Sequence, residues 1–151
     1  MKKLKLSSSV LMVAALSVLL SACGDPSKSE APAMVEGRLA GCPDKPNCVQ
    51  SEYPSDSEHY IAPIDISGNP LTVWKRLQDA VHNTGGRIVE KENLYIAATY
   101  TTDLVKFVDD VQLRVDLLGQ KIQVRSVSRV GYSDLGANAK RVEAIRAAFA
   151  K

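Results

Sequence analysis

The sequence predicts an α+β domain: a single antiparallel meander sheet of four strands, with two helices packed on one face. Three observations predict it. A capped amphipathic segment comes first, four strand-like segments then follow one another through short turns, and a second amphipathic segment ends the chain. Strands joined by tight turns pair antiparallel, and helices are then needed to cover the apolar face of the sheet.

The first helix is predicted from Asn69 to about His82. Asn69 is a favoured N-cap residue, and Pro70 suits the first helical position. Gly85 and Gly86 are expected to end the helix. The residues that form one stripe at helical spacing are Val73, Trp74, Leu77, Ala80 and Val81.

Four strands are predicted at residues 87–92, 94–102, 107–118 and 121–130. A tight turn at Glu92-Asn93 joins the first two, and Gly119-Gln120 suits a two-residue type II′ turn between the last two. The final helix is expected at residues 134–150, with Ser133 or Asp134 as its N-cap. Its buried face is predicted to consist of Leu135, Val142, Ile145 and Phe149.

The N-terminus is typical of an exported protein. Basic residues precede the apolar run at residues 10–20, which is too short to span a bilayer as a helix and reads as a signal peptide of residues 1–22. The sequence Leu20-Ser21-Ala22-Cys23 resembles the lipobox of bacterial lipoproteins. That resemblance implies cleavage before Cys23, diacylglycerol on its sulfur and an acyl chain on its amine. A plain secretory signal with a chance cysteine is the alternative.

Gly24 indicates in which membrane the protein is anchored. An aspartate at this position would resemble an inner-membrane retention signal, so glycine favours the outer membrane, facing the periplasm. Residues 23–41 are rich in Pro, Ser, Gly and charge without a sustained period, and are expected to be a lipidated flexible tether to a domain of residues 42–151.

The net charge argues against nucleic-acid binding. Lys2, Lys3 and Lys5 account for three of the 19 basic residues, so after cleavage 16 basic residues stand against 17 acidic ones. The mature chain is therefore slightly acidic, and no basic surface for nucleic acid is expected.

Cys42 and Cys48 enclose five residues in "CPDKPNC". In an oxidising periplasm two such cysteines are expected to form a disulfide. Metal binding is the alternative, but no nearby Cys or His completes a ligand set; we expect no metal and no cofactor.

The last two strands carry the candidate ligand- or partner-binding residues. Pairing about Gly119-Gln120 puts Asp110 opposite Arg129, a sensible ion pair, and Arg114 opposite Arg125, where like charges destabilise the sheet. A negative group is therefore expected near the two arginines. It could be Asp116, a carboxylate from elsewhere in the chain, or a bound anion, which a guanidinium binds well.

A second polar set lies on the helix-facing side. Ser126 and Ser128 are expected to be small packing residues, because a nucleophilic serine needs a base that the local sequence does not place nearby. Asp109 and Asp110 point to opposite faces and do not converge. The expected structural network consists of Asp109, Ser126, Ser128, Asp134, Asn138 and Arg141.

The segments "CPDKPNC", "FVDDVQLR" and "IQVRSVSRVGYSDLGANAKRVEAIR" resemble the bacterial family called domain of unknown function 1499, over roughly residues 41–147. The polar positions of the motif that match are Arg125, Ser126, Ser128, Arg129, Asp134, Asn138 and Arg141. The resemblance implies small lipoproteins or membrane-attached proteins, without an established reaction.

The leading hypothesis is a non-enzymatic lipoprotein of the envelope, anchored in the membrane through the lipid on Cys23. It would bind an envelope protein or a small anionic ligand through the arginine-rich surface. One alternative is an envelope hydrolase or transferase with Asp109 or Asp110 as general base; the other is a purely structural accessory subunit.

Overall fold

The computed structural model describes residues 24–103 and 105–151. The predicted signal peptide, residues 1–22, and the predicted lipidation site, Cys23, lie outside the described residues. Within the described part no helix is both long and apolar enough to cross a membrane.

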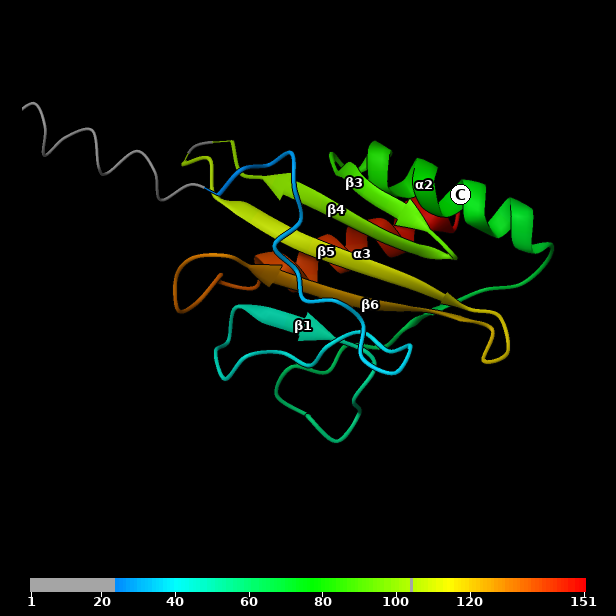
Figure 1. Cartoon of the computed structure of the whole chain (residues 1–151), viewed down its shortest axis with the longest axis horizontal. Coiled ribbons are helices and arrows are strands. Elements are labelled where there is room, and N and C mark those ends of the chain that lie inside the picture. The colour runs from blue at the N-terminus through cyan, green and yellow to red at the C-terminus, as the bar shows by residue number, and fades with distance from the viewer. Residues whose placement is uncertain (1–23, 104) are drawn as a thin grey trace, which may run out of the picture.

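The fold is α+β, as expected, but its sheet has six strands and the prediction of four was wrong (Figure 1). The strand order is β1-β6-β5-β4-β3, with β2 also paired to β6. The expected meander is present as β3 (Arg87–Glu92), β4 (Tyr95–Thr101), β5 (Val108–Asp116) and β6 (Lys121–Ser128), with every neighbour antiparallel.

The two additional strands are β1 (Cys48–Gln50) and β2 (Ile64–Asp65), and both pair antiparallel with β6. They have three and two residues, so neither contains enough positions to show the alternation that identifies a strand in sequence. They convert β6 from the expected edge strand into an interior strand. The disulfide between Cys42 and Cys48, which was predicted, closes the loop that leads into β1.

Two helices, α2 (Pro70–Asn83) and α3 (Ala137–Phe149), pack on one face of the sheet (Figure 1). Asn69 caps α2 as predicted, accepting a hydrogen bond from Leu71 N at 2.8 Å. The buried core under the helices includes Leu77 from α2, Ile145 from α3 and Leu113 from β5.

The start of α3 differs from the prediction. The helix begins at Ala137, and Leu135 is 90% exposed instead of lying on the buried stripe. The reason is a turn with positive φ at Leu135 (53°) and Gly136 (81°), which interrupts the helical period before Asn138. Val142, Ile145 and Phe149 are buried as predicted.

Two turns are also displaced. The β5–β6 connection has four residues, 117–120, because Asp116 pairs with Lys121. The predicted two-residue turn at Gly119-Gln120 was therefore wrong: the loop begins two residues earlier and ends where it was expected. Side chains keep their faces because the register changes by two. The β3–β4 turn is Asn93-Leu94, with positive φ at both residues (48° and 66°), the signs of a type I′ turn.

The segment from Gly24 to Ala40, drawn in blue to cyan in Figure 1, crosses the face of the sheet opposite the helices. We call it the N-terminal segment. Thr99 Oγ1 donates to Pro26 O at 2.7 Å and Gln112 Nε2 donates to Pro32 O at 2.8 Å. Leu39 is completely buried beside Tyr95 and Ala97. The described part of the expected tether thus makes more contact with the domain than its composition suggested.

Candidate functional site

The candidate binding residues Asp110 and Arg129 form an ion pair, as expected, although they are diagonal and not directly opposed. Arg129 Nε lies 2.8 Å from Asp110 Oδ2 and Nη2 lies 2.9 Å from Oδ1, the two-point geometry that makes arginine–carboxylate pairs strong. Both side chains are buried under the N-terminal segment. Arg129 also donates to the backbone oxygens of Asp25 and Lys28, and the backbone N–H of Glu30 donates to Asp110.

Arg114 has its own carboxylate partner. The predicted pairing of Arg114 with Arg125 was wrong, because Arg114 opposes Gln123. Its guanidinium lies 2.8 Å from Glu52 Oε1 and 4.0 Å from Asp116 Oδ2. The negative group near Arg114 is therefore internal, and it comes mainly from the loop after β1.

Arg125 is the one arginine of the four candidate residues without a carboxylate at ion-pair distance among the described residues. It opposes Gln112, with Nη1 3.4 Å from Gln112 Oε1, and its Nε donates to Gly41 O at 3.2 Å. Arg125 is 5% exposed. Burial lowers the pKa of its guanidinium, and the negative charge of Asp110 opposes that shift. Arg114, Arg125 and Arg129 thus do not form an open surface for an external anion.

The residues expected to form a structural network do so, on the helix-facing side of β5 and β6. Asn138, fully buried at the start of α3, is its centre. Its Oδ1 accepts hydrogen bonds from Ser126 Oγ and Arg141 Nη1, both at 2.5 Å. Its Nδ2 lies within 3.0 Å of Ser128 Oγ, Asp134 Oδ2 and Asn47 O.

Asp109 closes the network by pairing with Arg141 Nη2. Arg141 also lies over the ring of Tyr100, 5.0 Å from its centroid. Asp109 and Asp110 therefore bind different arginines on opposite faces of β5, which confirms that they do not converge on one site.

Asp134 fixes the turn before α3. Its Oδ2 accepts from Asn138 N at 2.7 Å and its Oδ1 accepts from Gly136 N at 2.9 Å. Burial alone would raise the pKa of the Asp134 carboxyl, but these donors outweigh it and the pKa is lowered. The N-cap residue of α3 is Gly136, without a side-chain cap hydrogen bond, so the predicted N-cap at Ser133 or Asp134 was wrong. The Asp134 carboxylate nevertheless accepts from a backbone N–H in the first turn of the helix, from a position three residues before its start.

A cleft of about 120 Å³ opens beside this network. Asp109, Ser128 and Asp134 form its polar wall, while Phe107 and Gly131 contribute from the two loops at that end of the sheet. We call the segment from Val130 to Gly136 the motif loop. Two of its side chains, Tyr132 and Leu135, are 71% and 90% exposed, so they contribute little to the core.

The contacts of the serines do not assemble a nucleophile. Ser126 Oγ donates to Asn138 and is contacted by Arg141. His59 lies elsewhere, with Nδ1 2.9 Å from Asp56 Oδ1 and Nε2 3.1 Å from Lys45 O. Within the described residues neither histidine hydrogen-bonds to Ser126 or Ser128.

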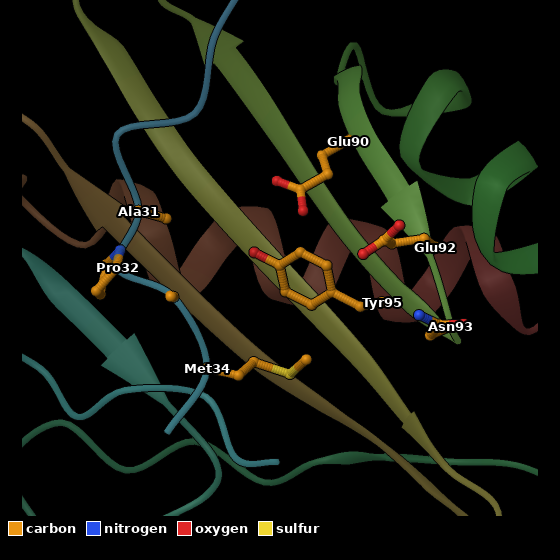
Figure 2. A pocket seen from close by; sticks show the side chains of 8 residues that line it. Ala31, Pro32, Met34, Glu90, Glu92, Asn93 and Tyr95 are labelled. Atoms are coloured by element: carbon orange, nitrogen blue, oxygen red, sulfur yellow. The ribbon is translucent and has the colours of Figure 1, made fainter. Parts of the chain in front are cut away.

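A larger cavity, of about 380 Å³, lies on the other face between the N-terminal segment and β3–β4 (Figure 2). Glu90 and Glu92 point from β3 toward Tyr95, and Met34 forms the opposite wall. Burial raises the pKa of the Tyr95 hydroxyl, which accepts a hydrogen bond from Gln112 Nε2 at 2.9 Å. No group of three or more His, Cys, Asp or Glu side chains suited to a metal ion occurs in the described part of the chain.

Sequence reasoning missed two of the residues that organise these sites. Asn47 donates to the backbone oxygens of Ser128 and Gly131, so it ties the cysteine loop to the motif loop. Glu52 is buried and forms ion pairs with Arg38 and Arg114. Both lie in irregular segments, where no period reveals which side chains point inward.

The family comparison agrees with the resemblance seen in the motifs. The model of a family described as "Protein of unknown function (DUF1499)" matches residues 38–149, which include the sheet, both helices and the network. No curated protein and no solved structure matches the chain. Since the match spans well over half of the 151 residues, the chain belongs to the DUF1499 family.

Proposed function

We propose that this chain is a non-enzymatic binding or accessory protein of the bacterial cell envelope, anchored by lipid on Cys23 in the outer membrane and facing the periplasm. The lipobox-like sequence at the end of the apolar leader supports the anchor, and the disulfide fits an oxidising compartment.

The observation that supports the binding role is that the polar network holds the motif loop in place. Its side chains hydrogen-bond to one another and hold the motif loop through Asp134, Asn138 and Asn47. The loop so held presents Tyr132 and Leu135 to solvent. A rigid scaffold that fixes an exposed loop is the usual arrangement of a recognition site.

The arginine-rich surface receives less support as the binding site, because each guanidinium already has internal acceptors. An enzymatic role receives less support too, because the carboxylates of Asp109 and Asp110 are each engaged by an arginine. The motif loop is therefore the recognition element that we propose.

Replacing Tyr132 and Leu135 together with alanine tests the binding role. Because both are largely exposed, we expect the free energy of unfolding to change by less than about 1 kcal/mol, while complementation of a deletion strain is lost. Leu118→Ala is the matched control, since Leu118 is 100% exposed at the other end of the sheet. If the double variant complements as well as Leu118→Ala, the loop is not a recognition site and a purely structural role is favoured.

The anchor is tested separately. Metabolic labelling with a fatty acid should mark the wild type and fail to mark Cys23→Ala. Gly24→Asp should move the protein to the inner membrane. Gly24→Asn is its control, because any side chain at Gly24 crowds Arg129 and Glu30. Equal labelling of wild type and Cys23→Ala would remove the anchor, and equal sorting of the two Gly24 variants would remove the outer-membrane location.

A further inference from the structure

Three exposed apolar side chains belong to the loops at one end of the sheet. Phe107, Tyr132 and Leu135 are 45%, 71% and 90% exposed. They belong to two loops, the β4–β5 connection and the motif loop, which line the same cleft. Exposed aromatic and aliphatic side chains on neighbouring loops are typical of a contact surface.

The first described residue lies at this same end. Gly24 is next to Arg129, since a Cβ added to Gly24 would be 2.6 Å from Arg129 Nη1. Arg129 directly follows β6, and its backbone N–H donates to Val108 O at the start of β5. Figure 1 shows the blue start of the chain at the end of the sheet where the motif loop lies.

Cys23 is one peptide bond away, and consecutive Cα atoms are about 3.8 Å apart. A lipid on Cys23 would therefore enter the bilayer beside Phe107, Tyr132 and Leu135. The N-terminal segment leaves little freedom for another orientation. A free tether of its length would let the domain move about 20–25 Å from the membrane, whereas this segment is hydrogen-bonded to Thr99, Asp110 and Gln112.

We propose that this end of the domain rests on the membrane, with Phe107, Tyr132 and Leu135 in the lipid interface. The proposal rests on the lipid anchor of the proposed function and identifies the partner of the motif loop as the bilayer surface. Tyrosine suits the headgroup region because its ring is apolar and its hydroxyl is polar. In the β4–β5 loop the charges of Asp103 and Lys106 offset each other, and Asp134 adds a negative charge in the motif loop. Apolar contact and not attraction to anionic lipid is therefore expected to dominate.

The opposite end of the sheet provides an internal control. Leu118, in the β5–β6 loop, is an apolar side chain that is 100% exposed, so it is more accessible than any of the three proposed contact residues. The nine residues of β5 separate the two ends by about 25–30 Å. If exposure of apolar side chains alone drove insertion into the bilayer, both ends of the sheet would insert equally. An anchor beside Gly24 would instead bring only the end with the motif loop to the bilayer.

The test uses the full mature lipoprotein in vesicles of phosphatidylethanolamine and phosphatidylglycerol, with bromine on the acyl chains of a fraction of the lipids. Trp74, the one tryptophan in the sequence, is changed to Phe. Tyr132→Trp, Phe107→Trp and Leu118→Trp are then introduced singly. Vesicles should blue-shift the emission of the first two variants, because the indole leaves water, and brominated lipid should quench it. Leu118→Trp should show neither effect, at low and at high salt.

Each other outcome overturns the proposal. Quenching of Leu118→Trp alone would reverse the orientation. Equal quenching at all three positions, or none while the protein floats with the vesicles, would show a domain without fixed contact. Failure of the protein to float would refute the lipid anchor first, and with it the membrane contact that depends on it. Thermal unfolding of each variant verifies that the fold is retained.

Discussion

Replacing Asn138 with alanine should destabilise the domain more than any exposed substitution in α3. Asn138 is fully buried, and its amide satisfies Ser126 Oγ, Arg141 and the backbone oxygen of Asn47. Alanine would leave the buried Ser126 hydroxyl and the Asn47 oxygen without this partner. A buried polar group that loses its partner costs about 1–3 kcal/mol, so two such groups predict a loss of about 3 kcal/mol.

The measurement is chemical or thermal unfolding of the oxidised protein. For a domain of this size a loss of 1 kcal/mol lowers Tm by about 4 °C, so Asn138→Ala should lower it by about 12 °C. Lys140→Ala is the matched control, because it removes an exposed side chain two residues away in the same helix and should change stability by less than about 0.5 kcal/mol.

A double-mutant cycle with Ser126→Ala isolates the contact between the two side chains. Removing both partners of a buried hydrogen bond costs less than the sum of the single changes, so the double variant should be more stable than additivity predicts. If Asn138→Ala unfolds with the Tm of Lys140→Ala, the network contributes nothing to stability and the reasoning for the motif loop fails.

Three further outcomes are expected. Glu52→Gln should lower stability by about 2 kcal/mol, since Arg114 loses its nearest carboxylate; unfolding in denaturant measures it, and unchanged stability would show that Asp116 suffices. Asp134→Asn should remove part of the acid sensitivity: the lowered pKa of Asp134 gives stability that is present above about pH 4 and lost as pH falls through the folded-state pKa, so wild type and variant should converge in acid. Reduction of the disulfide of Cys48 should cost about 2 kcal/mol because the loop is short, and a larger loss would mean that β1 depends on it.

The elements that could be predicted from sequence are those with a repeated pattern. The helix from Pro70 to Asn83 has a cap, an apolar stripe and a glycine stop, and each local signal agrees with the others. The four meander strands are six to nine residues long and follow one another through short turns, so their order was recognisable. The faces of β5 and β6 followed from period-2 pairing in the last hairpin. The disulfide between Cys42 and Cys48 followed from the spacing of the cysteines and from the expected oxidising compartment.

What could not be predicted depends on contacts between distant irregular segments. β1 and β2 exist because the edge of β6 offers hydrogen bonds, and their own residues contain no alternation. Glu52 reaches Arg114 across 62 positions in sequence. The predicted hairpin register was wrong because a four-residue loop places Leu117 and Leu118 outside the strands. The turn propensity of Gly119-Gln120 is compatible with both loop lengths, so it could not distinguish them.

The candidate site was predicted only in part, because some of its residues follow a repeated pattern and others depend on contacts between distant segments. The network residues Asp109, Ser128 and Asn138 share faces that period-2 and helical patterns define, and their grouping was correct. The arginines share a face too, but their exposure was not predictable, because it depends on the N-terminal segment. That segment is held by Pro, Ser and backbone groups, whose composition alone is typical of a tether.

The two adjacent aspartates of β5 explain how the N-terminal segment and the motif loop can be fixed together. Asp110 binds Arg129, which holds the backbone of residues 25 and 28, while Asp109 binds Arg141, which holds Asn138 and so the motif loop. Because consecutive strand residues point to opposite faces, one strand end fastens a different segment on each side. Gly24 and the motif loop then lie at the same end of the sheet, so a lipid on the residue before Gly24 would set the orientation of the motif loop as well as its distance from the membrane.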